Sequence, residues 1–151
     1  MQRKKTDENA SLLNHIYHTA QLRLDAVQML LPQVRNEPPL RRQAERQKED
    51  YLFIAEKTKQ MLRDSGRMPD SERFLKKAVS LGSLRMNTFA NKTPAHIAKV
   101  MITGTEAGIS DMTKNLNLFD GAEIPTKKLA EEYILNEQKN IDALRLHTWH
   151  A

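Results

Sequence analysis

Four long segments of this sequence carry apolar residues every three or four positions, and proline or glycine residues separate each segment from the next. That spacing is typical of amphipathic α-helices, because residues three and four positions apart lie on the same face of a helix. The alternation typical of a half-buried β-strand is missing throughout the chain. The sequence therefore predicts an all-α fold, built as a four-helix bundle.

Local signals set the bounds of the predicted helices. These helices cover residues 8–35, 39–64, 94–119 and 126–148. Thr93 is placed to cap the third helix, and Pro94 takes its first position, where the missing N–H of proline costs nothing. Gly66 is the expected stop after the second helix. Pro32 should bend or thin the last turn of the first helix.

The connections predict how these helices pair. Short connections join the first helix to the second and the third to the fourth, so each pair should form an antiparallel hairpin. The connection over residues 66–93 is long, and residues 71–86 within it are predicted to form a short amphipathic helix. One long crossover between two hairpins is typical of ferritin-like bundles. We therefore expect a ferritin-like layout, with a plain five-helix arrangement as the alternative.

Length and composition limit the class of protein. A chain of 151 residues fits a single domain and can fold without disulfide or metal support. Residues 1–7 are expected to form a flexible, charged tail. The absence of cysteine excludes thiolate catalysis and thiolate metal sites. The apolar runs are far too short to span a membrane and the first residues do not resemble a signal peptide, so we expect a cytoplasmic protein.

The net charge of +5 is concentrated in the middle of the chain. Residues 35–92 carry 14 Lys and Arg against 8 Asp and Glu, whereas residues 93–151 carry 6 against 8. The basic residues near the start of the second predicted helix are Arg41, Arg42, Arg46 and Lys48. Such a segment can attract nucleic acid or an acidic protein. Acidic residues are interleaved with the basic ones, however, so we favour a solvated surface of mixed charge.

The histidines do not stand where a ferritin-like metal centre needs them. Di-iron members of that class place a Glu on each of two helices and a Glu-x-x-His pair on each of the other two. None of the five histidines follows an inner-face acidic residue by three positions. Glu137 has Asn140 at that spacing, and asparagine is a weak ligand for iron or manganese. We therefore predict no metal site and no cofactor. Motifs for phosphate loops, hydrolase nucleophiles and zinc sites are also absent, so we predict no enzymatic activity.

Glu137 is the least expected residue of the predicted core, because it lies on the apolar stripe of its helix between Ile134 and Ile141. A buried carboxylate needs hydrogen bonds or a cation, since burial disfavours its charged form. The polar residues at other inner-face positions are its candidate partners: Tyr17, Gln47, Tyr51, Thr58, Thr105 and Asn140. We expect a satisfied polar network that fixes helix register. The alternative is a small cavity that binds a ligand or a single ion.

Gly104 and Gly108 stand four residues apart in the middle of the third predicted helix. Each glycine costs roughly 1 kcal/mol relative to alanine at such a position. Small residues at this spacing allow another helix to come close. We therefore expect tight packing of this helix against a neighbour, or against its own copy in a dimer.

One stretch of the chain resembles a known group of proteins. The segment 97–117, IAKVMITGTEAGISDMTKNLN, followed by Leu129-Ala130 and by NEQKNI at 136–141, is similar to small uncharacterised helical proteins of Gram-positive, often spore-forming bacteria. These proteins look related to ferritin-like bundles. The resemblance implies that fold but supplies no activity or metal site. The chain departs from metal-binding ferritins at every histidine ligand position, which puts iron storage and oxidase activity in doubt.

These observations favour a non-enzymatic helical bundle that associates with itself or with a protein partner and acts as an interaction or structural component. A ferritin-like protein that binds a metal or small ligand near Glu137 is the first alternative. A nucleic-acid or nucleoprotein binder that uses residues 35–92 is the second.

Overall fold

The helices seen in the computed structural model agree with the periodicity of the sequence. The structure describes residues 2–69 and 93–148, with side chains from residue 7 onward, and the described part of the chain contains no β-strand. The elements are α1 (Gln2–Leu30), a short 3-10 helix (Leu31–Val34), α2 (Pro38–Asp64), α4 (Pro94–Leu118) and α5 (Ile124–Arg145). The short helix predicted for residues 71–86 lies outside the described residues.

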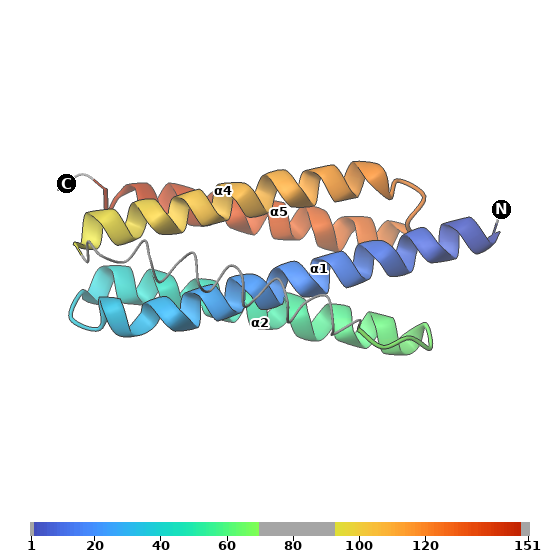
Figure 1. Cartoon of the computed structure of the whole chain (residues 1–151), viewed down its shortest axis with the longest axis horizontal. Helices are drawn as coiled ribbons and strands as arrows, with labels where there is room; N and C mark the ends of the chain where they lie inside the picture. The colour runs from blue at the N-terminus through green and yellow to red at the C-terminus, as the bar shows by residue number, and fades with distance from the viewer. Residues whose placement is uncertain (1, 70–92, 149–151) are drawn as a thin grey trace.

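The four long helices form two antiparallel hairpins, α1 with α2 and α4 with α5, which pack against each other side by side (Figure 1). Between the hairpins, α1 packs mainly on α4, and α2 packs on α5. Helices α2 and α4 run in the same direction (Figure 1). The end of α2 and the start of α4 therefore lie at opposite ends of the bundle. The described helices thus form an all-α bundle of four long helices.

The predicted helix signals act where the sequence places them. The side chain of Thr93 accepts a hydrogen bond from the backbone N–H of His96 and caps α4. Gly66 ends α2 with φ +75°, and Arg67 N–H donates to the carbonyl of Leu62. That bond and the one from Gly66 N–H to Arg63 form the Schellman arrangement, which satisfies carbonyls at the helix end. The 3-10 turn that contains Pro32 confirms the thinned end of α1.

Two predicted helix starts need correction. Helix α1 begins at Gln2 instead of near residue 8, so the tail predicted for residues 1–7 is helical from Gln2 on. Its charged residues are good helix formers, and no proline or glycine interrupts them. Helix α5 begins at Ile124 instead of residue 126, because Pro125 sits in the first turn, where proline is tolerated. Asn9 of α1 supports this start: its Oδ1 accepts the N–H of Glu123 at 3.0 Å.

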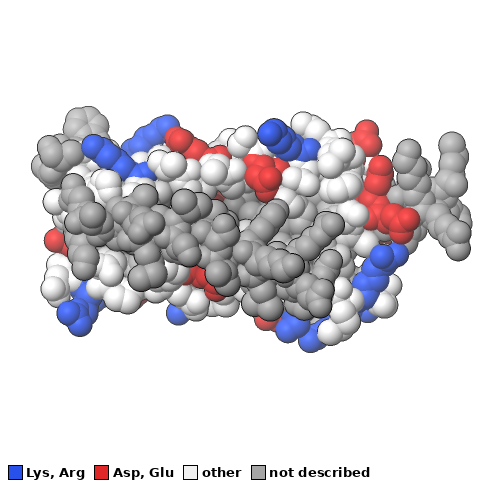
Figure 2. Space-filling view, viewed as in Figure 1, with Lys and Arg blue, Asp and Glu red and all other residues white. Residues whose placement is uncertain are grey.

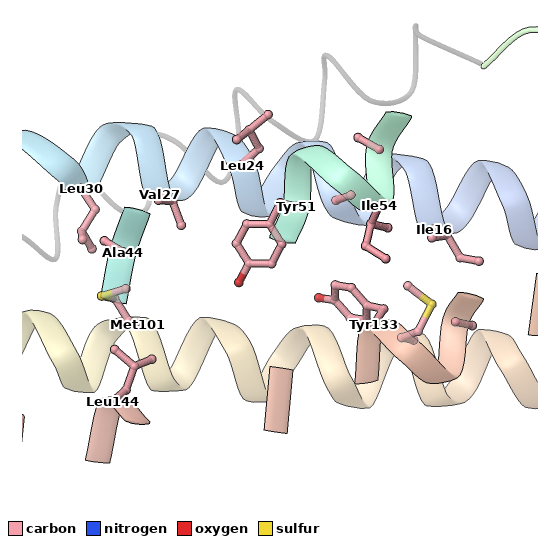
Figure 3. Close-up of a cluster of buried hydrophobic side chains, with 14 of the residues drawn as sticks. Ile16, Leu24, Val27, Leu30, Ala44, Tyr51, Ile54, Met101, Tyr133 and Leu144 are labelled. Atoms are coloured by element: carbon pink, nitrogen blue, oxygen red, sulfur yellow. The ribbon is translucent and has the colours of Figure 1, made fainter. Parts of the chain in front are cut away.

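The core lies along the axis between the two hairpins (Figure 3). Apolar side chains such as Ile16, Val27 and Leu144 are buried along it. At mid-height the core also holds buried polar and charged side chains, and all four long helices contribute to this group. The polar centre of the core is therefore the feature that sets this bundle apart from an ordinary apolar one.

Candidate functional site

The carboxylate of Glu137 is at the centre of the buried polar group and is 0% exposed. The hydroxyl of Tyr51 lies 2.8 Å from Oε1 and 3.0 Å from Oε2, and the amide of Asn140 donates to Oε1 at 2.8 Å. The hydroxyl of Tyr133 donates to Oε2 at 3.3 Å. Figure 3 shows both tyrosine hydroxyls pointing into the space between the hairpins. Burial of Glu137 is therefore matched by three donor groups.

Arg23 of α1 supplies the positive charge for this carboxylate. Its side chain is 7% exposed, and its Nε lies 3.6 Å from Oε2 of Glu137. Its Nη2 donates to Oγ1 of Thr105 on α4 at 2.9 Å, and the guanidinium carbon lies 5.6 Å from the ring centroid of Tyr51. A buried cation and a buried anion thus pair across the boundary between the hairpins.

Sequence reasoning missed Arg23, although the signal was present. Position 23 continues the apolar stripe of α1 that runs through Ile16, Ala20 and Val27 at steps of three and four residues. An arginine on that stripe is as unexpected as Glu137 on the stripe of α5. The two exceptions have opposite charges, and the structure places them together.

Gly104 and Gly108 make room for this centre. A Cβ atom added to Gly104 would lie 2.5 Å from Nη1 of Arg23, and one added to Gly108 would lie 2.5 Å from the hydroxyl oxygen of Tyr133. Both distances are too short for any real Cβ contact. The sequence predicted that another helix comes close at these positions, whereas the structure shows that the glycines admit two long side chains, one from α1 and one from α5.

Two glutamines extend the network toward the end of the bundle where α2 begins. Gln43 donates to Oδ1 of Asn140 at 3.1 Å and to Oε1 of Gln47 at 3.2 Å. Gln47 in turn donates to the hydroxyl of Tyr51 at 3.1 Å. The chain Gln43, Gln47, Tyr51 lies on α2, whereas Glu137 and Asn140 lie on α5. These bonds fix the register of α2 against α5.

The environment shifts the ionisation of the central groups. Burial raises the pKa of Glu137, and Arg23 and the three hydrogen-bond donors act against that rise. Burial also raises the pKa of Tyr51 to about 12 and that of Tyr133 well above its ordinary value. Burial by itself lowers the pKa of Arg23, but the nearby Tyr51 and Glu137 outweigh it and raise the pKa. Both tyrosines are therefore neutral donors at physiological pH, and Arg23 stays charged.

Two of the predicted partners lie away from Glu137. Tyr17 is half-buried, and its hydroxyl accepts a hydrogen bond from Gln21 one turn along α1. Thr58 is buried, but its hydroxyl donates to backbone carbonyls within α2. Thr105 belongs to the centre through its bond with Arg23, and its own hydroxyl donates to Met101 O at 2.8 Å. The centre therefore includes Gln47, Tyr51, Thr105 and Asn140 from the predicted set.

The basic residues at the start of α2 lie among acidic ones. Nε of Arg41 is 3.9 Å from Glu45, and both side chains are exposed. Arg42 and Arg46 are exposed, and Lys48 is partly buried. Where Figure 2 shows described side chains, Lys and Arg groups and Asp and Glu groups both occur around the edges of this face.

A second polar contact joins the same two helices as Arg23 and Thr105. Nε2 of His15 on α1 lies 2.7 Å from Oδ2 of Asp111 on α4.

No three His, Asp or Glu side chains of the described segments come close enough together to hold a metal ion. Within those segments, none of the helices has the length and apolar character to cross a membrane.

Comparisons of the chain with protein-family models, with curated proteins and with solved structures find no match.

Proposed function

We propose that this chain is a non-enzymatic, ferritin-like helical bundle of the cytoplasm that associates with itself and acts as a structural or interaction component. One observation carries the non-enzymatic part of the proposal: both carboxylate oxygens of Glu137 are engaged by groups of the same chain. A general acid or base must reach its substrate within hydrogen-bond distance. Glu137 is 0% exposed and bonded on both oxygens, so its role is to hold the two hairpins together.

The direction of the helices supports the ferritin-like layout. Ferritin-like bundles join two hairpins by one long crossover, which makes the second and third long helices parallel. Helices α2 and α4 are parallel in this chain (Figure 1). The charge of Arg23 occupies the centre of the bundle, where the metal-binding members of that class hold their ions.

Apolar side chains on the outer surface support association. Phe53 on α2 is 55% exposed and Leu135 on α5 is 57% exposed. Burial of a large apolar side chain in an interface stabilises it by roughly 1.5 to 3 kcal/mol. Phe53 and Leu135 are therefore the first positions to substitute in a test of self-association.

Light scattering coupled to size-exclusion chromatography tests the proposal over a range of protein concentrations. We expect a mass above that of one chain, and a shift toward one chain in the variants Phe53→Glu and Leu135→Glu. Gln138→Glu adds the same charge at an exposed position of α5 and should leave the mass unchanged. A single-chain mass at every concentration contradicts self-association. Stoichiometric iron, manganese or zinc in the purified protein contradicts the non-metal role.

A further inference from the structure

We infer that the centre of this bundle is an internal binding site for a guanidinium group, in which Arg23 is the resident ligand and Gly104 with Thr105 selects the planar group over other cations. The guanidinium comes from α1, whereas the groups around it come from the other three helices. Thr105 belongs to α4, Glu137 to α5 and Tyr51 to α2. The surroundings therefore have the composition of a receptor site for a cation.

Each contact uses a different part of the guanidinium group. Nη2 donates to Thr105 at 2.9 Å, Nε faces Glu137 at 3.6 Å, and Cζ lies 5.6 Å from the ring centroid of Tyr51. A guanidinium offers five N–H donors in a rigid plane and stacks on aromatic rings, whereas an ammonium group is a compact point charge. A lysine at position 23 offers one nitrogen in place of the separate Nη2 and Nε atoms that these contacts use.

The shape of the site also fits a planar group. Nη1 takes the place that a side chain at position 104 would fill, because a Cβ there would be 2.5 Å from Nη1. A glycine in mid-helix is less favourable than alanine, so its presence beside Nη1 needs a local reason. Space for the second amino group of the guanidinium supplies that reason.

Replacement of Arg23 by alanine should leave the site free to bind a small guanidinium compound added to the solution. In Arg23→Ala, the side chain beyond Cβ is lost and Glu137 is left without its cation. We expect the melting temperature to fall by about 10 °C, because breaking a buried pair is strongly destabilising in a domain of this size. Millimolar ethylguanidinium should restore several degrees of this loss with saturable dependence on concentration, since a ligand that binds only the folded state stabilises it. The melting temperature of the wild type should not rise.

Three control solutes separate shape from charge. Ethylammonium supplies the charge without the plane, urea supplies the plane without the charge, and sodium chloride matches the ionic strength. None of them should stabilise Arg23→Ala as ethylguanidinium does. Equal stabilisation by ethylammonium or sodium chloride overturns the selectivity, and no stabilisation by ethylguanidinium overturns the site.

Two further variants test whether Gly104 and the planar group of Arg23 cause the selectivity. Arg23→Ala/Gly104→Ala puts a methyl group where Nη1 lies. At least ten times more ethylguanidinium should then be needed for the same rise in melting temperature. Arg23→Lys should melt several degrees below the wild type, and equality with the wild type overturns the requirement for a planar group. If Arg23→Ala is unfolded in buffer, helix formation on addition of ethylguanidinium, followed by far-UV circular dichroism, replaces the melting temperature. Absence of that helix formation overturns the inference.

Discussion

The missing side chain of Gly108 on α4 makes room for the hydroxyl group of Tyr133 on α5. A Cβ at position 108 would lie 2.5 Å from that oxygen, which donates to Glu137 from a fully buried ring. The glycine and the tyrosine are therefore coupled through space. Neither residue can change without an effect on the other.

This coupling predicts that the effect of Gly108→Ala on the free energy of unfolding changes sign when Tyr133 is replaced by phenylalanine. Gly108→Ala should lower the free energy of unfolding by about 1 to 3 kcal/mol in the wild type, because overpacking a buried site forces side chains to move. In a Tyr133→Phe background the hydroxyl is gone, and the same substitution should raise it by roughly 1 kcal/mol through helix propensity. Urea unfolding of the four proteins measures both effects. Gly104→Ala is the control: its Cβ meets Arg23, so Tyr133→Phe should not relieve it.

Local signals explain how far the sequence predicted the fold. The end of α2 and the start of α4 followed from Gly66, Thr93 and Pro94, whose effects depend only on the neighbouring backbone. Helix α5 begins two residues before the predicted start, because Pro125 lies within its first turn and does not precede it. The support that Asn9 gives to this start comes from a residue more than 100 positions away, which no local pattern reports.

The candidate site was predicted in part for a similar reason. Burial of Glu137 followed from the stripe of its own helix, and it is a local inference. The pairing with Arg23 depends on how two hairpins dock, and periodicity within each helix does not specify that docking. Gly104 pointed to a close contact, but a glycine does not reveal whether a backbone or a side chain approaches it.

The Arg23 and Glu137 pair predicts strong energetic coupling. Arg23→Met removes the cation and leaves a buried carboxylate, which should cost about 3 to 5 kcal/mol of unfolding free energy at neutral pH. In Arg23→Met/Glu137→Gln no charge is left, and the amide can still bond to the tyrosine hydroxyls, so most of the loss should be recovered. A double-mutant cycle by urea unfolding gives the coupling energy. Additive losses in the two single variants would show that the pair is not coupled.

Glu137 also predicts a direction for the pH dependence. Burial raises its pKa above the ordinary value of 4.5, so the folded chain binds this proton more tightly than the unfolded chain. The stabilising contribution is complete below 4.5 and is lost as the pH rises through the folded pKa. The unfolding free energy of the wild type should therefore fall with pH in that window relative to Glu137→Gln. Urea unfolding from pH 4 to 8 measures the difference.

Other carboxylates also contribute to the pH dependence of the unfolding free energy. Burial raises the pKa of Asp25 and of Asp50, although Asn140 and the basic neighbours of Asp50 act against the rise. These groups remain in Glu137→Gln, so that variant should show a smaller slope with pH, not a flat line. A slope equal to that of the wild type would contradict the assignment of the shift to Glu137.

The pair of His15 and Asp111 predicts a much smaller effect than the buried pair. The Nε2 to Oδ2 distance is 2.7 Å, but the Asp111 side chain is 55% exposed, and ion pairs exposed to solvent contribute only about 0.2 to 1 kcal/mol. Asp111→Asn should lower the unfolding free energy by no more than that, and 1 M sodium chloride should remove most of the difference. Asp142→Asn, which alters the exposed pair with Arg145 within α5, is the matched control. A salt-independent loss at Asp111 that is larger than the loss at Arg23 would mean that α1 and α4 are held together near His15 instead of at the polar centre.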